Sequence, residues 1–277
     1  MSTTEIKALL DLLLDDDSRI RSAAADRLCA LGAAGAEALE VAASSDDARL
    51  RARARGILWT IHTSEACRRF EALLADDVFD LEAASIMLAR TEVPDLSPLV
   101  IEAELDRLAE GLKEQIEPEA PNHETAEVFG RFLCETEGFR GNSVDPEDPR
   151  NTYLDQVLRR RIGIPISLSA VYLMVGRRLG LELRGVGMPF HFLVSMGRGE
   201  ERVLLDPFGG GRIMSPKACK ALLAGYRLSF REEYLRPISD RHMMRRIIAN
   251  LVRAWHGRGD ACRLTRLYGF VNVLQKK

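Results

Sequence analysis

The stretch that decides the fold runs from Asn151 to Arg212 and reads NTYLDQVLRRRIGIPISLSAVYLMVGRRLGLELRGVGMPFHFLVSMGRGEERVLLDPFGGGR. Its apolar segment Ile164–Leu179 ends at Gly180, which is typical of a buried helix closed by a glycine. Alternating apolar residues then predict two strands, and His191 lies within the second. A further short strand leads into Asp206, followed by Pro, Phe and three glycines. The sequence therefore predicts a helix followed by strands that carry a histidine and an aspartate.

The first 75 residues contain a repeat with a period of 30. The repeated positions are Asp16-Asp17, Asp46-Asp47 and Asp76-Asp77, then Ala24, Ala54 and Ala84, then Leu28, Leu58 and Leu88. A period of this length, with small residues followed by leucines, indicates stacked helical hairpins. The third copy keeps these positions but loses the arginines that follow the aspartates in the first two. We interpret it as the point where the repeats give way to a central domain.

Composition places the chain among ordinary globular proteins. Hydrophobic residues make up 46% and charged residues 29%, and the net charge of -2 favours neither nucleic acid nor an anionic membrane. The five cysteines are scattered without zinc or redox spacing, which predicts reduced thiols in a cytoplasmic protein and gives no sign of a metal or other cofactor. The acidic N-terminal segment lacks a cleavage-site pattern, and no apolar run reaches the length of a membrane span. We expect neither a signal peptide nor a membrane helix.

Four arginines in the second repeat invite a nucleic-acid interpretation. They are Arg49, Arg51, Arg53 and Arg55. On a helix, a two-residue spacing spreads side chains over two faces rather than along one stripe. Acidic residues also lie close by in the sequence, so we favour ion pairs on a solvated surface. Phosphate binding stays the alternative.

The remaining segments are predicted to be mostly helical. Helices are expected over residues 81–114, broken near Pro94 and Pro98, and over residues 125–136. Asn151 is placed to cap the helix that follows it. Strands are expected only between about 181 and 235, with Leu228–Leu235 giving a strand and then a turn. From Ser239 onward the pattern predicts two helices.

A helix, a strand with His and a neighbouring strand ending in Asp is the layout of papain-like and transglutaminase-like cores. The chain resembles the transglutaminase-like SirB-type family of bacterial proteins, whose core also occurs in some F-box proteins. The matching motifs are Asn151–Asp155, Arg161–Leu168, Gly176–Gly180, Gly187–Phe192 and Asp206–Gly210, with Leu81–Leu105 and Phe139–Asn142 upstream. The resemblance covers about Asp76 to Leu235.

The resemblance implies an α+β, mostly helical protein of three parts. HEAT-like repeats would occupy residues 1–75, and a transglutaminase-like core with a small antiparallel sheet would occupy residues 76–235. A short tetratricopeptide-like helical tail would follow over residues 236–277. The repeats at the N-terminus resemble short HEAT-type hairpins, in which Asp and Arg lie at the turn between helices.

The resemblance also assigns roles at the site. An equivalent of His191 takes the proton of the nucleophile, and an equivalent of Asp206 fixes its tautomer. The family's catalytic Cys begins the central helix, where the helix N-terminus lowers its pKa. Counting back from Gly180 places that position at Pro165, and the nearest hydroxyls are those of Ser167 and Ser169. A buried structural His–Asp pair without chemistry is the alternative.

Two functions follow if Pro165 takes the position of the family's catalytic Cys. The first is a non-catalytic, pseudoenzyme-type protein that binds a peptide or protein partner in the cleft beside His191 and Asp206 and through its repeats. The second is a hydrolase or acyl transferase acting on peptide amides, in which the pair activates Ser167 or a water molecule. In either case the pocket residues are expected to be Asn142, Asn151, Pro165, Ser169, Met188 and Phe190.

Overall fold

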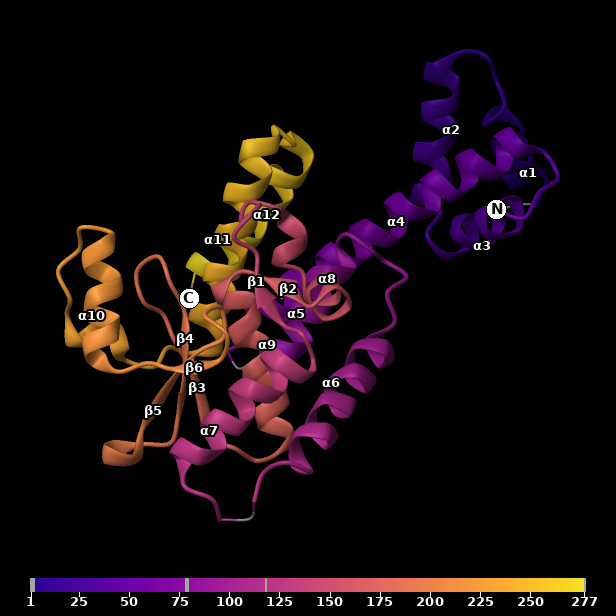
Figure 1. Cartoon of the computed structure of the whole chain (residues 1–277). Helices are drawn as coiled ribbons and strands as arrows, with labels where there is room; N and C mark the ends of the chain where they lie inside the picture. The colour runs from indigo at the N-terminus through magenta and orange to yellow at the C-terminus, as the bar shows by residue number, and fades with distance from the viewer. Residues whose placement is uncertain (1–2, 78–79, 118, 277) are drawn as a thin grey trace. The chain divides into compact units, whose positions relative to one another are not determined.

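The computed structural model describes residues 3–77, 80–117 and 119–276, and the chain divides into two compact units (Figure 1). Unit 1 comprises residues up to Arg69 together with Arg90–Asp95, and unit 2 comprises Phe70–Ala89 and the chain from Leu96 onward. The division falls within one long helix, α4 (Ala48–Ala75). The C-terminal helices belong to unit 2. The three-domain division at residues 75 and 235 stays a prediction.

Unit 1 is helical, and the starts of two of its helices recur with the 30-residue period of the repeat. Its helices are α1 (Thr3–Leu12), α2 (Ser18–Ala30), α3 (Ala33–Ala42) and the first part of α4. The Asp17 side chain accepts a hydrogen bond from the Arg19 backbone N–H at 2.8 Å, and Asp47 accepts one from the Arg49 backbone N–H at 2.7 Å. In each repeat an aspartate thus satisfies a free amide at the start of a helix.

The core of unit 1 repeats with the same period. Ala24 and Ala54 are buried at equivalent positions, as are Leu28 and Leu58, and all four belong to one apolar cluster. The third copy departs from the pattern at its helix start. There Asp80, four residues after Asp76, accepts hydrogen bonds from two backbone amides of α5 (Leu81–Arg90).

Three of the four arginines considered for nucleic-acid binding donate to backbone carbonyls in unit 1. Arg51 donates to the carbonyls of Ser45 and Asp46, Arg53 to that of Leu13, and Arg55 to that of Ala43. These carbonyls lie at or just after the ends of the preceding helices, where free acceptors collect. The arginines therefore contribute to the packing of the repeat.

Unit 2 surrounds a buried helix with further helices and a small sheet. Its helices besides α5 are α6 (Pro98–Lys113), α7 (Asn122–Arg131), α8 (Leu154–Arg160), α9 (Pro165–Arg178), α10 (Pro216–Gly225), α11 (Asp240–Arg258) and α12 (Ala261–Gln275), with a π-helical turn, Phe132–Thr136, after α7. Every residue of α9 from Ile166 to Gly176 is buried, as its continuous apolar pattern predicts.

Helix α9 is defined at both ends by local chemistry. Pro165 occupies its first turn, where a missing N–H costs nothing. At the other end Gly180 has a φ of +70°, and its N–H donates to the Arg177 carbonyl at 3.1 Å. The Leu181 N–H donates to the Gly176 carbonyl at 3.0 Å, which completes a Schellman motif. The glycine stop predicted from the sequence is confirmed.

The main sheet is antiparallel and lies between helices (Figure 1). Its strands, in spatial order, are β3 (Leu183–Val186), β4 (Leu193–Met196), β5 (Val203–Asp206) and β6 (Arg212–Ile213). Apolar residues of α10 pack with one set of strand side chains, and α7 and α9 contact the strands as well. The structure thus confirms a mostly helical α+β fold with a small antiparallel sheet.

Three local predictions were wrong. A parallel pair, β1 (Arg140–Gly141) with β2 (Ile162–Gly163), lies outside the range where strands were expected. Two residues are too few to leave an alternating pattern in a sequence. Leu228–Leu235 contains a 3-10 helix, Glu232–Leu235, instead of a strand. Asn151 ends the 3-10 helix Pro149–Asn151, and α8 begins after Tyr153, so Asn151 does not cap α8.

Candidate functional site

His191 and Asp206 meet because β4 and β5 run antiparallel. This arrangement brings the start of β4 beside the end of β5, where Val194 pairs with Leu205. His191 lies in the turn just before β4 rather than within the strand as predicted, and Asp206 is the last residue of β5. His191 Nε2 lies 2.8 Å from Asp206 Oδ1, and the side chains are 8% and 1% exposed. The pair is buried and directly hydrogen-bonded.

The environment of Asp206 favours its ionised form. Burial alone would raise the pKa of this carboxyl, but the hydrogen bond and charge of His191, the Gly209 N–H and the charge of Arg212 outweigh it. The Gly209 N–H donates to Oδ1 at 2.9 Å, and Arg212 Nη2 lies 3.4 Å from Oδ2. The pKa of Asp206 is therefore lowered. An aspartate held in this form can orient an imidazole and stabilise its protonated state.

The glycines after Asp206 allow a close turn around the carboxylate. A Cβ at Gly209 would overlap Asp206 Oδ2, and a Cβ at Gly130 of α7 would overlap the Gly211 carbonyl. Gly211 also has a φ of +71°, which favours glycine. These glycines serve the packing of the turn.

A groove of about 520 Å³ opens beside His191. One side is formed by the turn Pro189–Phe192, and the start of α9 contributes Ile164, Pro165 and Ile166. Residues 146–148 and Thr152 contribute another part, and α11 supplies a wall. Of the residues predicted for the site, His191, Pro165 and Phe190 line this groove, and Asp206 is hydrogen-bonded to His191.

Ser167, the tentative nucleophile, is used to cap α9. Its hydroxyl donates to the Asn151 carbonyl at 2.6 Å and accepts a hydrogen bond from the Ile164 N–H at 3.0 Å. The side chain is buried and does not line the groove. Ser169 is fully buried, and within the described residues its Oγ has no hydrogen-bond partner. The structure does not bring either hydroxyl into the groove with His191.

The other three predicted pocket residues lie behind the groove lining. Asn142 Nδ2 donates to Asn151 Oδ1 at 3.1 Å, and Asn151 Nδ2 donates to the Asp145 carbonyl at 2.8 Å. The Asn142 carboxamide oxygen also accepts hydrogen bonds from the backbone N–H groups of residues 144 and 145. The two asparagines therefore hold the loop before α8 in place. Met188 is fully buried, and its carbonyl accepts a hydrogen bond from Arg246.

None of the five cysteines lies at the start of α9, where the resemblance places the nucleophile. Cys134 lies in the π-helical turn, Cys219 is buried in α10, and Cys262 is exposed on α12; Cys29 and Cys67 belong to unit 1. Burial raises the pKa of Cys29, Cys134 and Cys219 above the usual range for a thiol. A raised pKa disfavours the thiolate, which is the reactive form.

Phe190 adopts a strained conformation at the edge of the groove. Its φ is +57°, and the His191 N–H donates to the Met188 carbonyl at 3.3 Å across a turn that also contains Pro189. A positive φ at the third position of such a turn favours glycine, and a bulky residue there is costly. Phe190 is nevertheless 68% exposed and stacks on Tyr226, with ring centroids 5.0 Å apart.

The sequence predicted the helix α11 but not that it forms one wall of the groove. Arg246, Ala249, Asn250, Arg253 and Ala254 of this helix line the groove. Most of them recur at intervals of three and four residues, beside the apolar face that contains Met243 and Ile247. That spacing is a usable signal for a shared face. It does not say which part of the chain the face meets.

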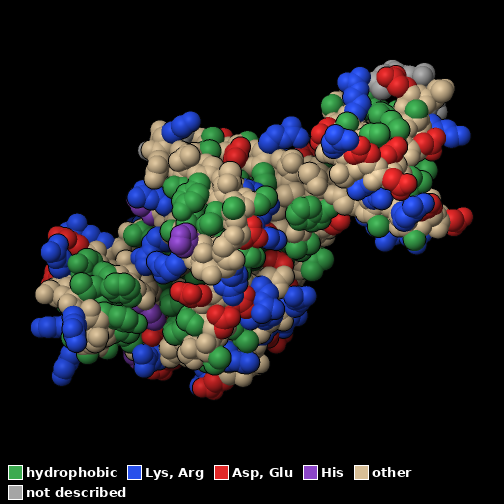
Figure 2. All heavy atoms as spheres, turned by 90° about the horizontal axis from the view of Figure 1, so that it is seen from above, with side chains coloured by type: hydrophobic (Ala, Val, Ile, Leu, Met, Phe, Trp, Pro, Cys, Tyr) green, Lys and Arg blue, Asp and Glu red, His purple; other side chains and the backbone are tan. Residues whose placement is uncertain are grey.

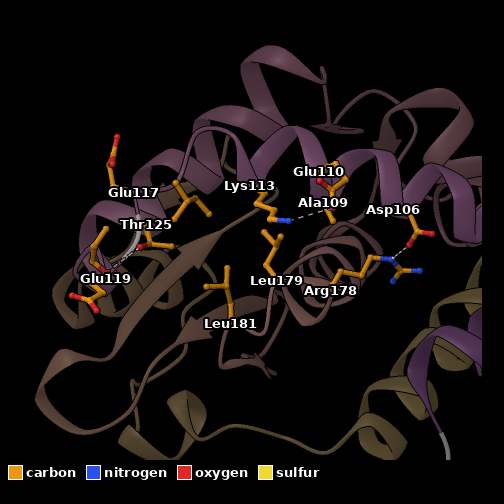
Figure 3. Close-up of a pocket in the computed structure, with 12 residues that line it drawn as sticks. Asp106, Ala109, Glu110, Lys113, Glu117, Glu119, Thr125, Arg178, Leu179 and Leu181 are labelled. Atoms are coloured by element: carbon orange, nitrogen blue, oxygen red, sulfur yellow. Dashed lines mark hydrogen bonds and ion pairs between the residues drawn. The ribbon is translucent and has the colours of Figure 1, made fainter.

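A larger cavity, of about 960 Å³, lies elsewhere in unit 2 (Figure 3). It is lined by α6, residues 116–120 as far as they are described, and the end of α9. Figure 3 shows its basic side chains paired: Arg178 lies 2.6 Å from Asp106, and Lys113 lies 3.7 Å from Glu110. Its lining in the described part of the chain includes neither His nor Cys, so we do not place the chemistry here.

Two further observations concern metals and membranes. Within residues 3–77, 80–117 and 119–276, no three His, Cys, Asp or Glu side chains gather as they do around a metal ion. Among the same residues, no helix combines the length and apolar character needed to cross a bilayer.

The buried helix, the antiparallel sheet and the His–Asp pair define a transglutaminase-like core. A family profile described as the Transglutaminase-like superfamily matches residues 100–249, which is more than half of the chain. The chain therefore belongs to the transglutaminase-like superfamily. No solved structure matches it.

Similar sequences occur in bacteria and animals. A UPF0162 protein of Xylella fastidiosa is 36% identical over 141 residues, covering 51% of this chain and 50% of that protein. A UPF0162 protein of Pseudomonas aeruginosa is 31% identical over 189 residues, covering 68% of this chain and 69% of that protein. F-box only protein 21 of Mus musculus is 41% identical over 93 residues, covering 31% of this chain and 15% of that protein. The chain thus spans about half the length of the Xylella relative.

Proposed function

We propose that the groove beside His191 binds a peptide or a protein segment without chemically converting it. The observation that carries this proposal is the composition of the groove: His191 shares it with Pro165, which lies at the start of α9 where a thiol enzyme of this fold needs its nucleophile. A proline has no group that can attack an acyl carbon. The His–Asp pair then serves as a rigid, polar part of a binding surface.

Phe190 supports a binding role for the same groove. An exposed aromatic ring held at positive φ costs free energy, and such strain concentrates at sites that contact ligands. Stacking on Tyr226 fixes the ring without covering it. A rigid, exposed aromatic side chain is the kind of residue that contributes most to peptide and protein interfaces.

The wider description of the protein is proposed on the same basis. We assign it to the SirB-type branch of the superfamily as a pseudoenzyme of the cytoplasm, with HEAT-like hairpins in residues 1–75 and a short tetratricopeptide-like tail. The repeated helix caps and buried positions of unit 1 support the HEAT-like interpretation. Helical repeats commonly present surfaces to protein partners, so unit 1 would add a second contact region.

The hydrolase or acyl transferase alternative requires a different nucleophile. Ser167 is held in the cap of α9, so the alternative depends on a water molecule activated by His191. It predicts turnover of a peptide amide, which the binding function does not. Mass spectrometry of a bound peptide after long incubation separates the two functions, since hydrolysis or transfer changes the peptide's mass.

The binding function is tested by selecting dodecapeptides from a random phage-displayed library on the full chain. Kd values of synthetic, fluorescein-labelled peptides are then measured by fluorescence polarisation. Replacing Phe190 with Gly (Phe190→Gly) should weaken binding about tenfold or more, because an interface anchor contributes about 2 kcal/mol or more.

The matched control is Tyr268→Ala, which removes an exposed aromatic ring from α12, outside the groove lining. Binding should be unchanged in this variant. If selected peptides bind equally well to the Phe190→Gly protein, the groove is not their binding site and the proposal is wrong.

A further inference from the structure

The arginines on α11 give the groove a charge that its other residues only partly balance. Helix α11 contains five arginines and one acidic residue, Asp240. Asp240 is already paired with Arg177, at 2.7 Å. No carboxylate on α11 is therefore left for Arg246 and Arg253, the two arginines of this helix that line the groove.

Arg246 is a half-buried cation bound by neutral groups. Its Nη2 donates to the Met188 carbonyl at 2.9 Å and to the His191 carbonyl at 3.2 Å, and its guanidinium lies 5.2 Å from the Phe192 ring. Burial lowers its pKa, although a guanidinium stays charged in any accessible pH range. No carboxylate among the described residues contacts it, so its charge acts on the groove in surroundings that screen it less than water does.

Arg253 lies two turns further along the same face of α11. It is exposed, and within the described residues no hydrogen bond or ion pair engages its side chain. Seven residues along a helix correspond to about 10 Å, so the two arginines are placed at either end of one wall. A free guanidinium at the edge of a groove has all five of its N–H donors available to a ligand.

The acidic residues of the groove do not cancel these charges. Asp148 is paired with Arg150 at 2.9 Å and with Arg160 at 3.3 Å. The Asp206 carboxylate forms an ion pair with Arg212 and a hydrogen bond with His191. Glu147 is the one acidic lining residue that, among the described residues, has no cation paired with it. Taken together, the side chains around the groove carry a positive surplus.

We propose that the groove selects an extended peptide segment that carries carboxylates next to an apolar side chain. Arg253 and Arg246 bind the carboxylates, and the apolar side chain packs against Phe190 and Ile164. This inference rests on the proposed function, since it names the class of peptide that the groove takes. Arginine binds carboxylates through paired hydrogen bonds, which gives orientation as well as affinity. An extended chain advances about 3.3 Å per residue and turns alternate side chains to the same face, so acidic residues two or four positions apart would reach both arginines through their long side chains.

A peptide fits these observations better than a nucleic acid does. Binding to a phosphate backbone depends on many cations that follow the strand. This groove offers two, includes the acidic Glu147, and has apolar surface from Pro165, Pro189 and Phe190. Basic side chains do gather at the left of Figure 2, toward the end of unit 2 that contains α10, so a single-stranded RNA belongs among the competitors to be tested.

The test uses the random dodecapeptide library on three forms of the full chain: unchanged, Arg253→Gln and Arg245→Gln. Arg245 is the matched control, because it is exposed on the same helix without a partner among the described residues and does not line the groove. Peptides selected on the unchanged chain should be enriched in Asp and Glu two or four positions apart, the spacings that place two side chains on one face of an extended chain. The enrichment should persist with Arg245→Gln and fall with Arg253→Gln.

Affinities then measure the contact directly. For a selected peptide, Asp→Asn replacement should weaken binding about tenfold, the change expected when one charge-assisted hydrogen-bonded pair is lost. Arg253→Gln should produce the same loss, and the two changes together should cost little more than either alone. Glu147→Gln should tighten binding of the acidic peptide, and Arg253→Glu should turn the preference toward Lys and Arg.

The outcomes distinguish this inference from the proposed function. Peptides that lose affinity with Phe190→Gly but show no acidic preference would overturn the inference and leave the binding function standing. Selection of no peptide that depends on Phe190 would overturn both. Displacement of an acidic peptide by a twelve-nucleotide RNA that binds more tightly, with the same dependence on Arg253, would assign the groove to nucleic acid instead.

Discussion

Replacing Asp206 with Asn tests how much the ionised carboxylate contributes to the core. The carboxylate accepts hydrogen bonds from His191 at 2.8 Å and from the Gly209 N–H at 2.9 Å while only 1% exposed. Asparagine has nearly the same shape and keeps one oxygen acceptor, but it lacks the charge. A hydrogen bond to a charged group stabilises a protein by about 1.5–3 kcal/mol and a neutral one by about 1 kcal/mol. With two such bonds weakened, Asp206→Asn should lower the free energy of unfolding by about 2 kcal/mol at pH 7.

The loss should depend on pH in a direction fixed by the pKa of Asp206. This pKa is lowered in the folded chain, so the carboxylate stabilises the fold above the unfolded value of about 3.9. As the pH falls through the lowered folded pKa, both states become protonated and the contribution disappears. The difference between the unchanged protein and Asp206→Asn should therefore be greatest near neutral pH and shrink toward zero in acid.

The assay is urea denaturation followed by tryptophan fluorescence. Trp59 belongs to unit 1 and Trp255 to unit 2, so a Trp59→Phe background leaves a signal from the unit that contains Asp206. The control is Asp106→Asn, which removes an exposed carboxylate from unit 2 and should change stability by less than about 0.5 kcal/mol. A double-mutant cycle with His191→Ala isolates the energy of the pair itself.

Three results would refute this reasoning. If Asp206→Asn costs less than about 0.5 kcal/mol at pH 7, the buried carboxylate does not stabilise the fold through its charge. If the cost is the same at pH 7 and in acid, the loss comes from packing or from the new amide and not from ionisation. A coupling energy near zero in the cycle would mean that His191 and Asp206 are neighbours without a stabilising hydrogen bond.

The other predictions concern the cap, the strained turn, the repeat and the thiols. Ser167→Ala should lower the free energy of unfolding by about 0.5–2 kcal/mol in the same urea assay, because the Ile164 N–H and the Asn151 carbonyl then keep only their mutual hydrogen bond of 3.3 Å; an equal stability, or loss of a measurable esterase activity without loss of stability, would contradict the capping role. Phe190→Gly should leave the Tm measured by calorimetry nearly unchanged, because glycine removes the cost of the positive φ and this gain offsets the lost stacking on Tyr226. A marked drop in Tm would show that the backbone strain at Phe190 is small. Leu28→Ala and Leu58→Ala should each cost about 2–5 kcal/mol by circular dichroism, and a negligible cost at either position would argue against an equivalent role in the repeat. In timed iodoacetamide labelling, exposed Cys262 should react first and no faster than a free model thiol; a faster cysteine at neutral pH would reveal an activated nucleophile.

Several elements could be predicted because their signals are local. The helix Pro165–Arg178 was found from a continuous apolar segment and a closing glycine, and its boundaries depend on residues within one turn of each end. The repeat in unit 1 placed its aspartates at the turns between helices, and there each one caps a helix within three residues of its start.

Other elements escaped prediction because their cause lies far away in the sequence. The pair Arg140–Gly141 and Ile162–Gly163 is two residues long and forms between segments about 20 residues apart, so it leaves no periodic pattern. Asn151 was a reasonable helix cap by residue type, but its side chain is taken by Asn142 and the Asp145 carbonyl across a loop. Residue type shows what a side chain can bind, and the path of the chain decides what it does bind.

The sequence by itself determined the buried helix, the three glycines after Asp206, the period of the N-terminal repeat and the proline at the start of that helix. These properties depend on the order of residues within one element or on counting along it. The resemblance implied that His191 pairs with Asp206, but only the tertiary structure decided that Ser167 is locked in a cap and that Arg246 and Arg253 face the groove. Each of these depends on which distant segments pack together when they bury their apolar faces. The hydrophobic effect is not directional, so the sequence of one segment does not show which other segment will cover it.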